Sequence, residues 1–311
     1  MRSKKKQNEI FKNKYLFRQH INFLQRKEGE FLEIDCPDIC EKRLEKLVYP
    51  CILKPLSGTA SMDIHKINSK EELLGILPKL SGKFILERYI KGDEYSVDVA
   101  TVASQHKTLL LAKKSCFENS YVEKSHLIDN SIQEGTLKLL EYEVDRFLNS
   151  IGYESGMAHI ELKLFDEEVE FIECQLRMGG DHLFDVYELI TGCDLSEVAY
   201  QIEEGEISSI SDIKSALRPN LTALIDYKHF YSESMQFVKW NSASLLQKTP
   251  HIFTSELPSS PETFNKKLKS SFDRNYCVVY VASDLSRILL SKGIIDKNVY
   301  PLFKLSASKH E

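Results

Sequence analysis

The sequence lacks several features that would point to particular classes of protein. None of its seven cysteines forms a CxxC pair, and several lie in apolar, strand-like segments where a reduced thiol behaves as a small hydrophobic group. We therefore expect neither a zinc site nor disulfides. No apolar run approaches the roughly 20 residues of a membrane span. A basic stripe interleaved with aromatic residues is also missing and the formal net charge is −5, so we expect no nucleic-acid partner.

What is present is an ordinary globular composition. The chain has 311 residues, of which 42% are hydrophobic and 28% charged, and this length allows one large domain or two to three subdomains. Its basic start, Met1–Lys6, leads into the polar residues Gln7, Asn8 and Glu9, so it is typical of neither a signal peptide nor a membrane anchor. We therefore expect a cytoplasmic protein that acts without a membrane.

Periodic apolar residues and turn signals predict alternating helices and strands. Ser69 and Glu72 have the spacing of a capping box, which predicts that a helix begins there. Helices are expected over residues 9–28, 69–80 and 132–151 and after Gly179. Strands are expected over residues 48–54, 63–67, 83–89, 95–103 and 108–113, with a hairpin over 157–177. This arrangement predicts an α+β fold rather than a parallel doubly wound sheet.

The segment 156–181 is the most informative passage. Over residues 158–164 and 172–177 of its two strand-like halves the even positions, Ile172 among them, are apolar and the odd positions are polar. The polar positions are His159, Glu161, Lys163, Glu173, Gln175 and Arg177. Alternate residues of a strand face opposite sides, so these side chains are expected to share one face. A turn centred near Glu167 places Glu161 directly opposite Glu173.

Two facing carboxylates repel each other unless something offsets their charge. Mg²⁺ takes oxygen ligands from one or two carboxylates together with substrate phosphates, so a bound metal explains the pair. Arg177 adds a planar donor suited to phosphate or carboxylate oxygens. Gly179 and Gly180 follow it and allow the backbone to approach a ligand closely. On spacing alone, the alternative is a solvated hairpin face of mixed charge.

A second group of residues is suited to a nucleotide. Lys54 ends an apolar strand and is followed by a small, hydroxyl-rich loop that contains Ser57 and Gly58, although the Walker pattern is missing. Such a loop can present ammonium, hydroxyl and backbone N–H groups to phosphates. In residues 84–99 two strands flank a short connector, with Glu87 and Glu94 seven residues apart. Taken alone, the first passage is weak evidence because most such lysines simply face solvent, and the alternative for the stronger second passage is an ordinary surface connection with two solvated acids.

Together these passages resemble the ATP-grasp superfamily. Glu173, Gln175 and Arg177 follow Glu161 by 12, 14 and 16 residues, which is similar to the Glu, Glu, Asn, Arg series of biotin carboxylase and its relatives. The resemblance implies that Glu161, Glu173 and Gln175 hold Mg²⁺, with Mn²⁺ as an alternative. It also implies that Arg177 contacts the reacting acyl or phosphoryl group. ATP is the nucleotide that it implies.

The same resemblance assigns the nucleotide contacts. Lys14 and Lys54 resemble the two phosphate-binding lysines, and residues 57–61 resemble a shortened phosphate-covering loop. Glu94 matches the acid that binds the ribose hydroxyls. The connector that contacts adenine, largely through its backbone, corresponds to Glu87, Arg88, Tyr89 and Ile90.

Within the superfamily the sequence resembles L-amino acid ligases of the bacilysin-synthetase and carnosine-synthase kind. The residues 121–126, 159–163 and 172–181 carry this likeness. It implies that Glu123 and His126 line the amino-acid site, with Gly179 and Gly180 as further substrate contacts. Without the likeness, a Glu/His pair of this kind is more often a surface pair.

Two departures from the family pattern bear on function. Gln175 stands where Asn is usual, which lengthens that ligand by one methylene group and would displace or weaken the second metal ion. Relatives also carry an N-terminal α/β domain before the helix of the first lysine, whereas thirteen residues precede Lys14. This difference implies a partner chain that supplies the missing domain, a large acceptor that brings its own surface, or lost ligase activity.

The implied fold is an ATP-grasp fold with a small lid subdomain and a larger antiparallel-sheet subdomain. We expect an N-terminal helical linker over 1–27, the lid over 28–88, the central subdomain over 89–205 and its C-terminal part over 206–311. The implied activity is an ADP-forming carboxylate–amine ligase that joins small-molecule carboxylate and amine substrates. Alternatives are a nucleotide-binding partner subunit or pseudoenzyme, and a carboxylase or purine-pathway enzyme, although the 121–126 passage does not support the latter.

Overall fold

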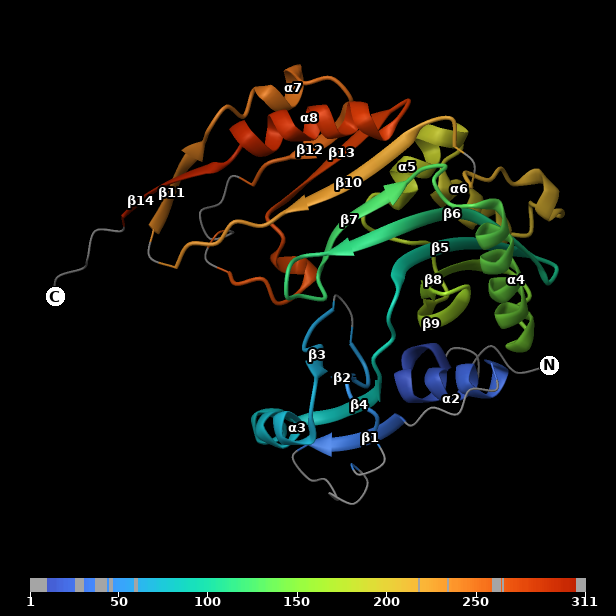
Figure 1. Cartoon of the computed structure of the whole chain (residues 1–311). Coiled ribbons are helices and arrows are strands. Elements are labelled where there is room, and N and C mark those ends of the chain that lie inside the picture. Colours follow the sequence, from blue (N-terminus) through green and yellow to red (C-terminus); the bar gives the residue numbers. More distant parts are fainter. Residues whose placement is uncertain are drawn as a thin grey trace. The chain divides into compact units, whose positions relative to one another are not determined.

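The structure is a computed structural model, and it describes residues 10–25, 31–36, 44, 47–58, 61–217, 219–233, 235–258, 264 and 266–305. The chain divides into two compact units, and Figure 1 labels the helices and strands of each. Unit 1 comprises residues 1–111 and 132–217, and unit 2 comprises residues 112–131 and 218–311. Strand β6 (Gln105–Cys116) spans the boundary between them.

A four-stranded antiparallel sheet forms the smaller part of unit 1, with strand order β1-β4-β2-β3. Helix α3 and the short 3-10 helix η2 join β3 to β4. Leu53, Ile67, Leu73 and Phe84 share one buried core, so the helix covers this sheet through the apolar side chain of Leu73. The elements are β1 (Phe31–Cys36), β2 (Cys51–Pro55), β3 (His65–Ile67), α3 (Lys70–Ile76), η2 (Leu77–Lys79) and β4 (Gly82–Arg88).

The start of α3 confirms one half of the predicted capping box. The Ser69 hydroxyl accepts a hydrogen bond from the Glu72 N–H at 3.2 Å. The Glu72 carboxylate, however, accepts from the backbone and side chain of Asn68, at 2.8 Å and 3.1 Å. The backbone donor therefore comes from one residue earlier than a capping box requires.

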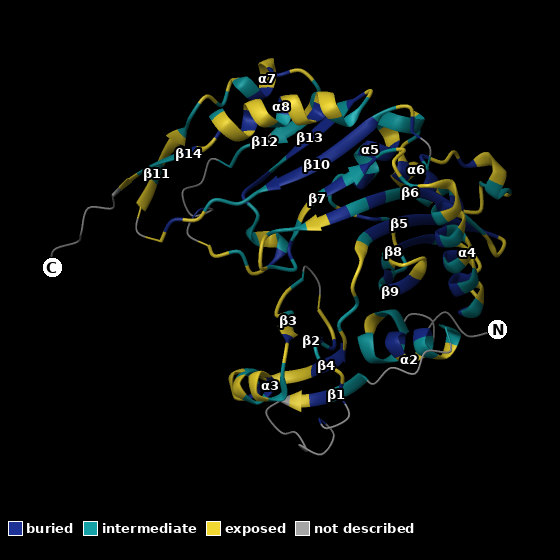
Figure 2. Ribbon diagram, viewed as in Figure 1, coloured by how far each residue is buried: buried dark blue, intermediate teal, exposed yellow. Residues whose placement is uncertain are grey.

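The larger sheet of unit 1 has the order β6-β5-β8-β9. Helices α2 and α4 supply Phe17, Ile21 and Phe147 to a core that also contains Val97 and Phe171 of the strands. Strand β5 is buried from Tyr95 onward (Figure 2). The remaining elements of unit 1 are α2 (Lys14–Gln25), β5 (Asp93–Val102), α4 (Glu134–Ser150), β8 (Gly156–Phe165), β9 (Glu168–Gln175), α5 (Leu183–Thr191), α6 (Leu195–Glu203) and η3 (Ile210–Asp212).

The β8–β9 hairpin has the predicted facing acids, but its register is not uniform. Asp166 and Glu167 form a two-residue turn with positive φ angles of 47° and 63°, and Phe165 pairs with Glu168. A turn of this type matches the twist of the flanking strands. The register then shifts at a β-bulge, because Phe171 pairs with Leu162 whereas Glu173 pairs with Glu161. The extra residue brings the two acids opposite each other.

The bulge also changes which residues of β9 are buried. Phe171 lies in the core and is fully buried, whereas Ile172, predicted on the buried face, is only half-buried. Cys174 is fully buried as predicted. The strict alternation expected across both strands therefore fails on β9, since the extra residue exchanges the two faces of the strand.

Unit 2 contains an antiparallel sheet with the order β12-β13-β10-β7, and β7 pairs with the last residues of β6. Val278, Tyr280, Ile288 and Ile295 form its core, in which α8 packs on β13. Strands β11 and β14 make a separate two-stranded sheet. The elements are β7 (Glu123–Ile128), β10 (Thr222–Lys228), β11 (Met235–Trp240), α7 (Leu245–Lys248), β12 (Ile252–Glu256), η5 (Ser271–Asp273), β13 (Tyr276–Ala282), α8 (Leu285–Asn298) and β14 (Pro301–Leu305).

The antiparallel sheets and packed helices confirm the α+β prediction. Of the helices in the described part of the chain, none has both the length and the apolar character that a bilayer crossing requires. Among the described residues, Cys51, Cys116, Cys174, Cys193 and Cys277 are not joined in disulfides.

Candidate functional site

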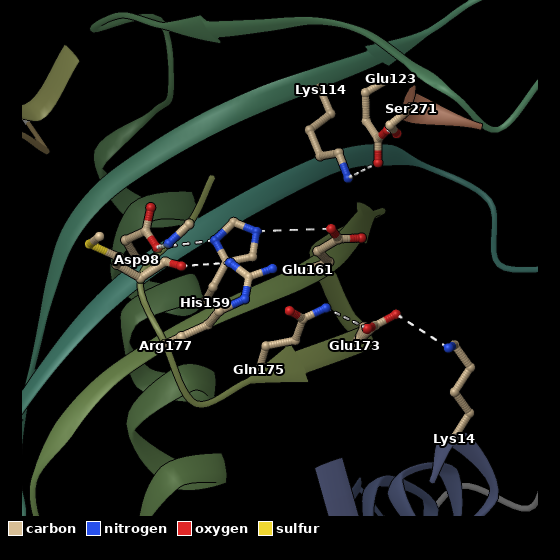
Figure 3. Close-up of polar contacts among 12 residues, drawn as sticks. Lys14, Asp98, Lys114, Glu123, His159, Glu161, Glu173, Gln175, Arg177 and Ser271 are labelled. Atoms are coloured by element: carbon tan, nitrogen blue, oxygen red, sulfur yellow. Dashed lines mark hydrogen bonds and ion pairs between the residues drawn. The ribbon is translucent and has the colours of Figure 1, made fainter. Parts of the chain in front are cut away.

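Two carboxylates face each other at the centre of the site. Glu161 on β8 and Glu173 on β9 are directly paired across the strands, and their side chains are 25% and 24% exposed (Figure 3). Both carboxylates are partly exposed, so a ligand's oxygen atoms can approach them. Two acids opposite each other on neighbouring strands repel each other unless a cation offsets their charge.

Lys14 brings a positive charge to this pair. It begins α2, where the Asn13 side chain accepts from the N–H groups of Tyr15 and Leu16 at 2.9 Å and 3.2 Å. Its Nζ lies 3.9 Å from Glu173 Oε2 and donates to the carbonyl oxygen of Gly58 at 3.0 Å. Lys14 thus contacts both a predicted metal-ligating carboxylate and the predicted phosphate loop. Thr59 and Ala60 of this loop lie outside the described residues.

The pKa of Lys14 reports the charges that surround it. Burial lowers the pKa, because it disfavours the charged ammonium group. The negative charge of Glu173 opposes this effect, the positive charge of Lys54 adds to it, and Glu87 and Glu161 raise the pKa in turn. The two predicted lysines and the two predicted metal-ligating acids therefore lie within one electrostatic neighbourhood.

Lys54 is held in a buried cluster of three charged side chains. Its Nζ lies 2.5 Å from Glu87 Oε1, and Arg18 Nε donates to Glu87 Oε2 at 2.7 Å. Burial alone would raise the pKa of Glu87, but the two cations and their hydrogen bonds lower it from 4.5 to about 2. The side chain of Glu87 thus belongs to the lysine cluster, while its backbone belongs to the predicted adenine connector.

This cluster predicts a specific loss of stability in acid. A carboxyl pKa lowered to about 2 stabilises the folded state fully above about pH 4.5, and the stabilisation is lost as the pH falls through 2. The lowered pKa of Glu87 contributes about 3 kcal/mol to the free energy of unfolding. Urea unfolding measured between about pH 5 and pH 2 should therefore show a steeper decline for the wild type than for Glu87→Gln. Parallel curves for the two proteins would contradict the assignment.

The predicted adenine connector is arranged around Lys163. The Lys163 Nζ donates to the Ile90 carbonyl at 3.3 Å, lies 3.7 Å from Glu94 Oε2 and sits 5.3 Å from the centre of the Tyr89 ring. Arg88 points elsewhere and pairs with Glu170 at 2.5 Å. One lysine of β8 therefore contacts both the connector and the predicted ribose-binding acid.

Asp98 contacts both the β8–β9 hairpin and the backbone at Gly179, which follows it. Its Oδ1 lies 3.0 Å from His159 Nδ1 and accepts from the Gly179 N–H at 2.7 Å, and Asp98 is 1% exposed. His159 Nε2 in turn lies 3.9 Å from Glu161 Oε1 (Figure 3). One buried carboxylate thus positions both the imidazole beside Glu161 and the backbone that follows Arg177.

Gln175 and Arg177 extend the polar face along β9. The Gln175 amide donates to Glu173 Oε1 at 2.8 Å, so it would have to turn its oxygen toward a metal ion to act as a ligand. Arg177 is exposed, donates to the Met178 carbonyl at 2.6 Å and forms no ion pair with another described residue. Its guanidinium group can therefore bind an anionic ligand.

The residues present fit magnesium on a nucleotide. Partly exposed Glu161 and Glu173 supply hard oxygen ligands, and Lys14 lies beside them where phosphates would come. Within the described residues no three His, Cys, Asp or Glu side chains are grouped to hold a metal ion. Phosphate and water oxygens would therefore have to complete the coordination, as is usual for Mg²⁺.

Glu123 and His126 belong to unit 2. Glu123 accepts from the Ser271 hydroxyl at 2.7 Å and lies 3.4 Å from Lys114 Nζ. His126 is 3% exposed and packs edge-on against the Tyr227 ring. Neither residue is a loose surface group, and their role in binding a substrate remains a prediction.

Sequence reasoning missed Arg18, Asp98 and the contacts of Lys163. Arg18 follows Lys14 by four residues, so helical periodicity alone places the two on one face. Asp98 is a charged residue inside an otherwise apolar strand, which is itself a signal of a buried polar partner. Lys163 was seen only as one polar position of the hairpin.

Comparison with known proteins matches part of the chain to a domain family. Residues 47–185 match the ATP-grasp domain family. A stretch of 65 residues is 32% identical to D-alanine–D-alanine ligase A of Bacillus cereus, covering 20% of this chain and 22% of that ligase. The chain therefore spans about a fifth of the curated relative that it matches.

Solved structures agree over almost the whole chain. An L-amino acid ligase from Bacillus licheniformis superposes with a TM-score of 0.80 at 18% identity, covering 96% of this chain and 73% of that one. A phosphoribosylglycinamide synthetase from Anaerococcus prevotii gives 0.63 at 17% identity, covering 96% and 75%. An N5-carboxyaminoimidazole ribonucleotide synthetase from Thermotoga maritima gives 0.66 at 13% identity, covering 95% and 74%.

The chain thus has the ATP-grasp fold, and its residues 47–185 match the ATP-grasp domain family. The fold expected from the sequence is confirmed. Within that fold, the architecture is similar to that of an L-amino acid ligase.

Proposed function

We propose that the protein is an ATP-dependent carboxylate–amine ligase that forms an amide bond through an acyl phosphate. The observation that carries this proposal is the direct pairing of Glu161 with Glu173, with Lys14 Nζ 3.9 Å from the second acid. Facing carboxylates with an adjacent ammonium group are suited to a magnesium–phosphate complex. The similar L-amino acid ligase supports an amino acid or peptide as substrate.

The proposed reaction has two steps. A carboxylate oxygen of the substrate first attacks the γ-phosphorus of ATP, and ADP leaves. An amine then attacks the carbonyl carbon of the acyl phosphate, inorganic phosphate leaves, and the nitrogen loses a proton to the surroundings. Both steps depend mainly on positioning and charge stabilisation rather than on a covalent intermediate with the protein.

Several side chains have roles in these steps. Lys14 and Lys54 would hold the phosphates through their ammonium groups, and Glu161 and Glu173, with Gln175 after rotation of its amide, would hold magnesium. The metal, when bound, would neutralise charge on the phosphate oxygens. Arg177 would stabilise the oxyanion of the tetrahedral intermediate, a contribution that is commonly worth two to three decades in rate, roughly 10²–10³.

The test is ADP release with Mg²⁺ and ATP across a panel of amino acids and peptides. Hydroxylamine should trap the acyl phosphate of an accepted carboxylate as a hydroxamate. We expect stoichiometric ADP, phosphate and amide with at least one substrate pair. Assays should be repeated with candidate partner chains, because a partner could supply part of the substrate site.

A nucleotide-binding partner subunit or pseudoenzyme is the second candidate, and the orientation of Gln175 favours it. Its amide donates to Glu173 and does not present an oxygen to a metal ion. Tight binding of Mg-ATP without turnover over the whole panel, alone and with partner chains, would support this candidate. Turnover by Gln175→Asn but not by the wild type would locate the defect at this position.

A further inference from the structure

Arg18 is a buried cation to which no role has been assigned. It lies one helical turn after Lys14 on α2 and is 6% exposed. Its Nη2 donates to the Phe171 carbonyl at 2.9 Å, which fixes the guanidinium against β9. Its Nε donates to Glu87 Oε2 at 2.7 Å. A single side chain thus connects helix α2 with strands β4 and β9.

Glu87 divides its carboxylate between two cations. One oxygen pairs with Arg18 and the other with Lys54, and all three side chains are 6% to 7% exposed. In such a site water screens the charges weakly, so each cation competes strongly for the shared carboxylate. If Arg18 were removed, both oxygens of Glu87 would be left to Lys54 alone.

We propose that Arg18 is a positioning residue that keeps Lys54 available to nucleotide phosphates by occupying half of the Glu87 carboxylate. This inference rests on the proposed nucleotide-binding function of the site. Lys54 Nζ already lies 2.5 Å from one Glu87 oxygen, and without Arg18 both oxygens would pair with Lys54, so binding a phosphate would require breaking a tighter pair. Breaking a buried pair is costly, so nucleotide affinity should fall.

The test compares the effect of removing Arg18 in two backgrounds. The affinity of Mg-ADP is measured by calorimetry for the wild type, Arg18→Met, Glu87→Gln and the double variant. Methionine keeps the length of the apolar stem and removes the charge. We expect Arg18→Met to weaken binding about tenfold when Glu87 is present and less than about threefold when residue 87 is glutamine.

The two backgrounds separate positioning from other causes. If Arg18 acted directly on the phosphates through its charge, removing it would weaken binding equally in both backgrounds, and the inference would be wrong. A purely structural role would lower the free energy of unfolding and leave the Mg-ADP affinity of the folded protein unchanged, which would also overturn it. Unfolding by urea is therefore measured for each variant.

Arg18→Lys supplies a conservative rescue. Lysine keeps a positive charge for Glu87 but has no planar fork with which to hold the Phe171 carbonyl as well. We expect Mg-ADP affinity within about threefold of the wild type, and a loss as large as that of Arg18→Met would contradict the proposal. If Arg18→Met does not fold, Arg18→Gln takes its place in both backgrounds. Failure of the wild type to bind Mg-ADP would instead refute the proposed function.

Discussion

Glu173→Gln is expected to reduce ADP formation by at least about 10³-fold, because it removes one of the two facing carboxylates while keeping the size of the side chain. The remaining Glu161 would hold Mg²⁺ less tightly on its own, and Lys14 loses the acid that lies 3.9 Å from it. The measurement is ADP release under saturating Mg-ATP, with the best carboxylate and amine found in the substrate panel. Glu173→Ala should abolish the activity.

The control for this substitution is Glu168→Gln. Glu168 lies on the same strand but is exposed at the turn end of the hairpin, opposite Phe165. The Glu168→Gln substitution therefore removes one negative charge from β9, as Glu173→Gln does, but at a position away from the site. Full turnover by Glu173→Gln, with Glu168→Gln also unchanged, would remove the metal assignment from this hairpin.

Gly179→Ala is expected to cost both activity and stability. An added Cβ atom would lie 2.7 Å from His159 Nδ1, 2.8 Å from Asp98 Oδ2 and 2.9 Å from Leu183 Cδ1. Two of these neighbours are held by the buried Asp98 hydrogen bonds, so they cannot give way freely. We expect a loss of roughly 1–3 kcal/mol in the free energy of unfolding. Displacement of the turn after Arg177 should lower ADP formation by about 10².

The matched control for stability is Gly180→Ala. A Cβ atom at this neighbouring glycine meets no heavy atom within 4 Å. Its free energy of unfolding should therefore stay within about 0.5 kcal/mol of the wild type. Equal destabilisation by the two alanines would show that the crowding around Asp98 is not the cause. Urea unfolding of both variants at neutral pH makes the comparison.

Much of the fold could be predicted because local signals agreed with the tertiary structure. The alternating polar and apolar residues of β8 form a strand, the helix expected over 132–151 is α4, and the spacing of Glu161 and Glu173 matches their observed pairing. The β-bulge could not be predicted, because a single extra residue leaves the composition of the strand unchanged. It was the bulge that exchanged the burial of Phe171 and Ile172.

The site was less predictable than the fold. Strand periodicity places Glu161, Glu173 and Gln175 on one face. It does not predict which side chain will pair with a buried cation such as Arg18. The pairing of Arg18 with Glu87 joins residues 69 positions apart, and that of Asp98 with His159 joins residues 61 apart. Such contacts depend on how the helix and sheets pack, and no local pattern reports them.

The measurement that most directly tests the account is anomalous X-ray scattering from Mn²⁺ in crystals grown with a non-hydrolysable ATP analogue. The account predicts Mn²⁺ within roughly 2.0–2.3 Å of carboxylate oxygens of both Glu161 and Glu173, bridged to the terminal phosphates. A nucleotide bound elsewhere on the chain, or bound here with no metal at these two acids, would contradict it.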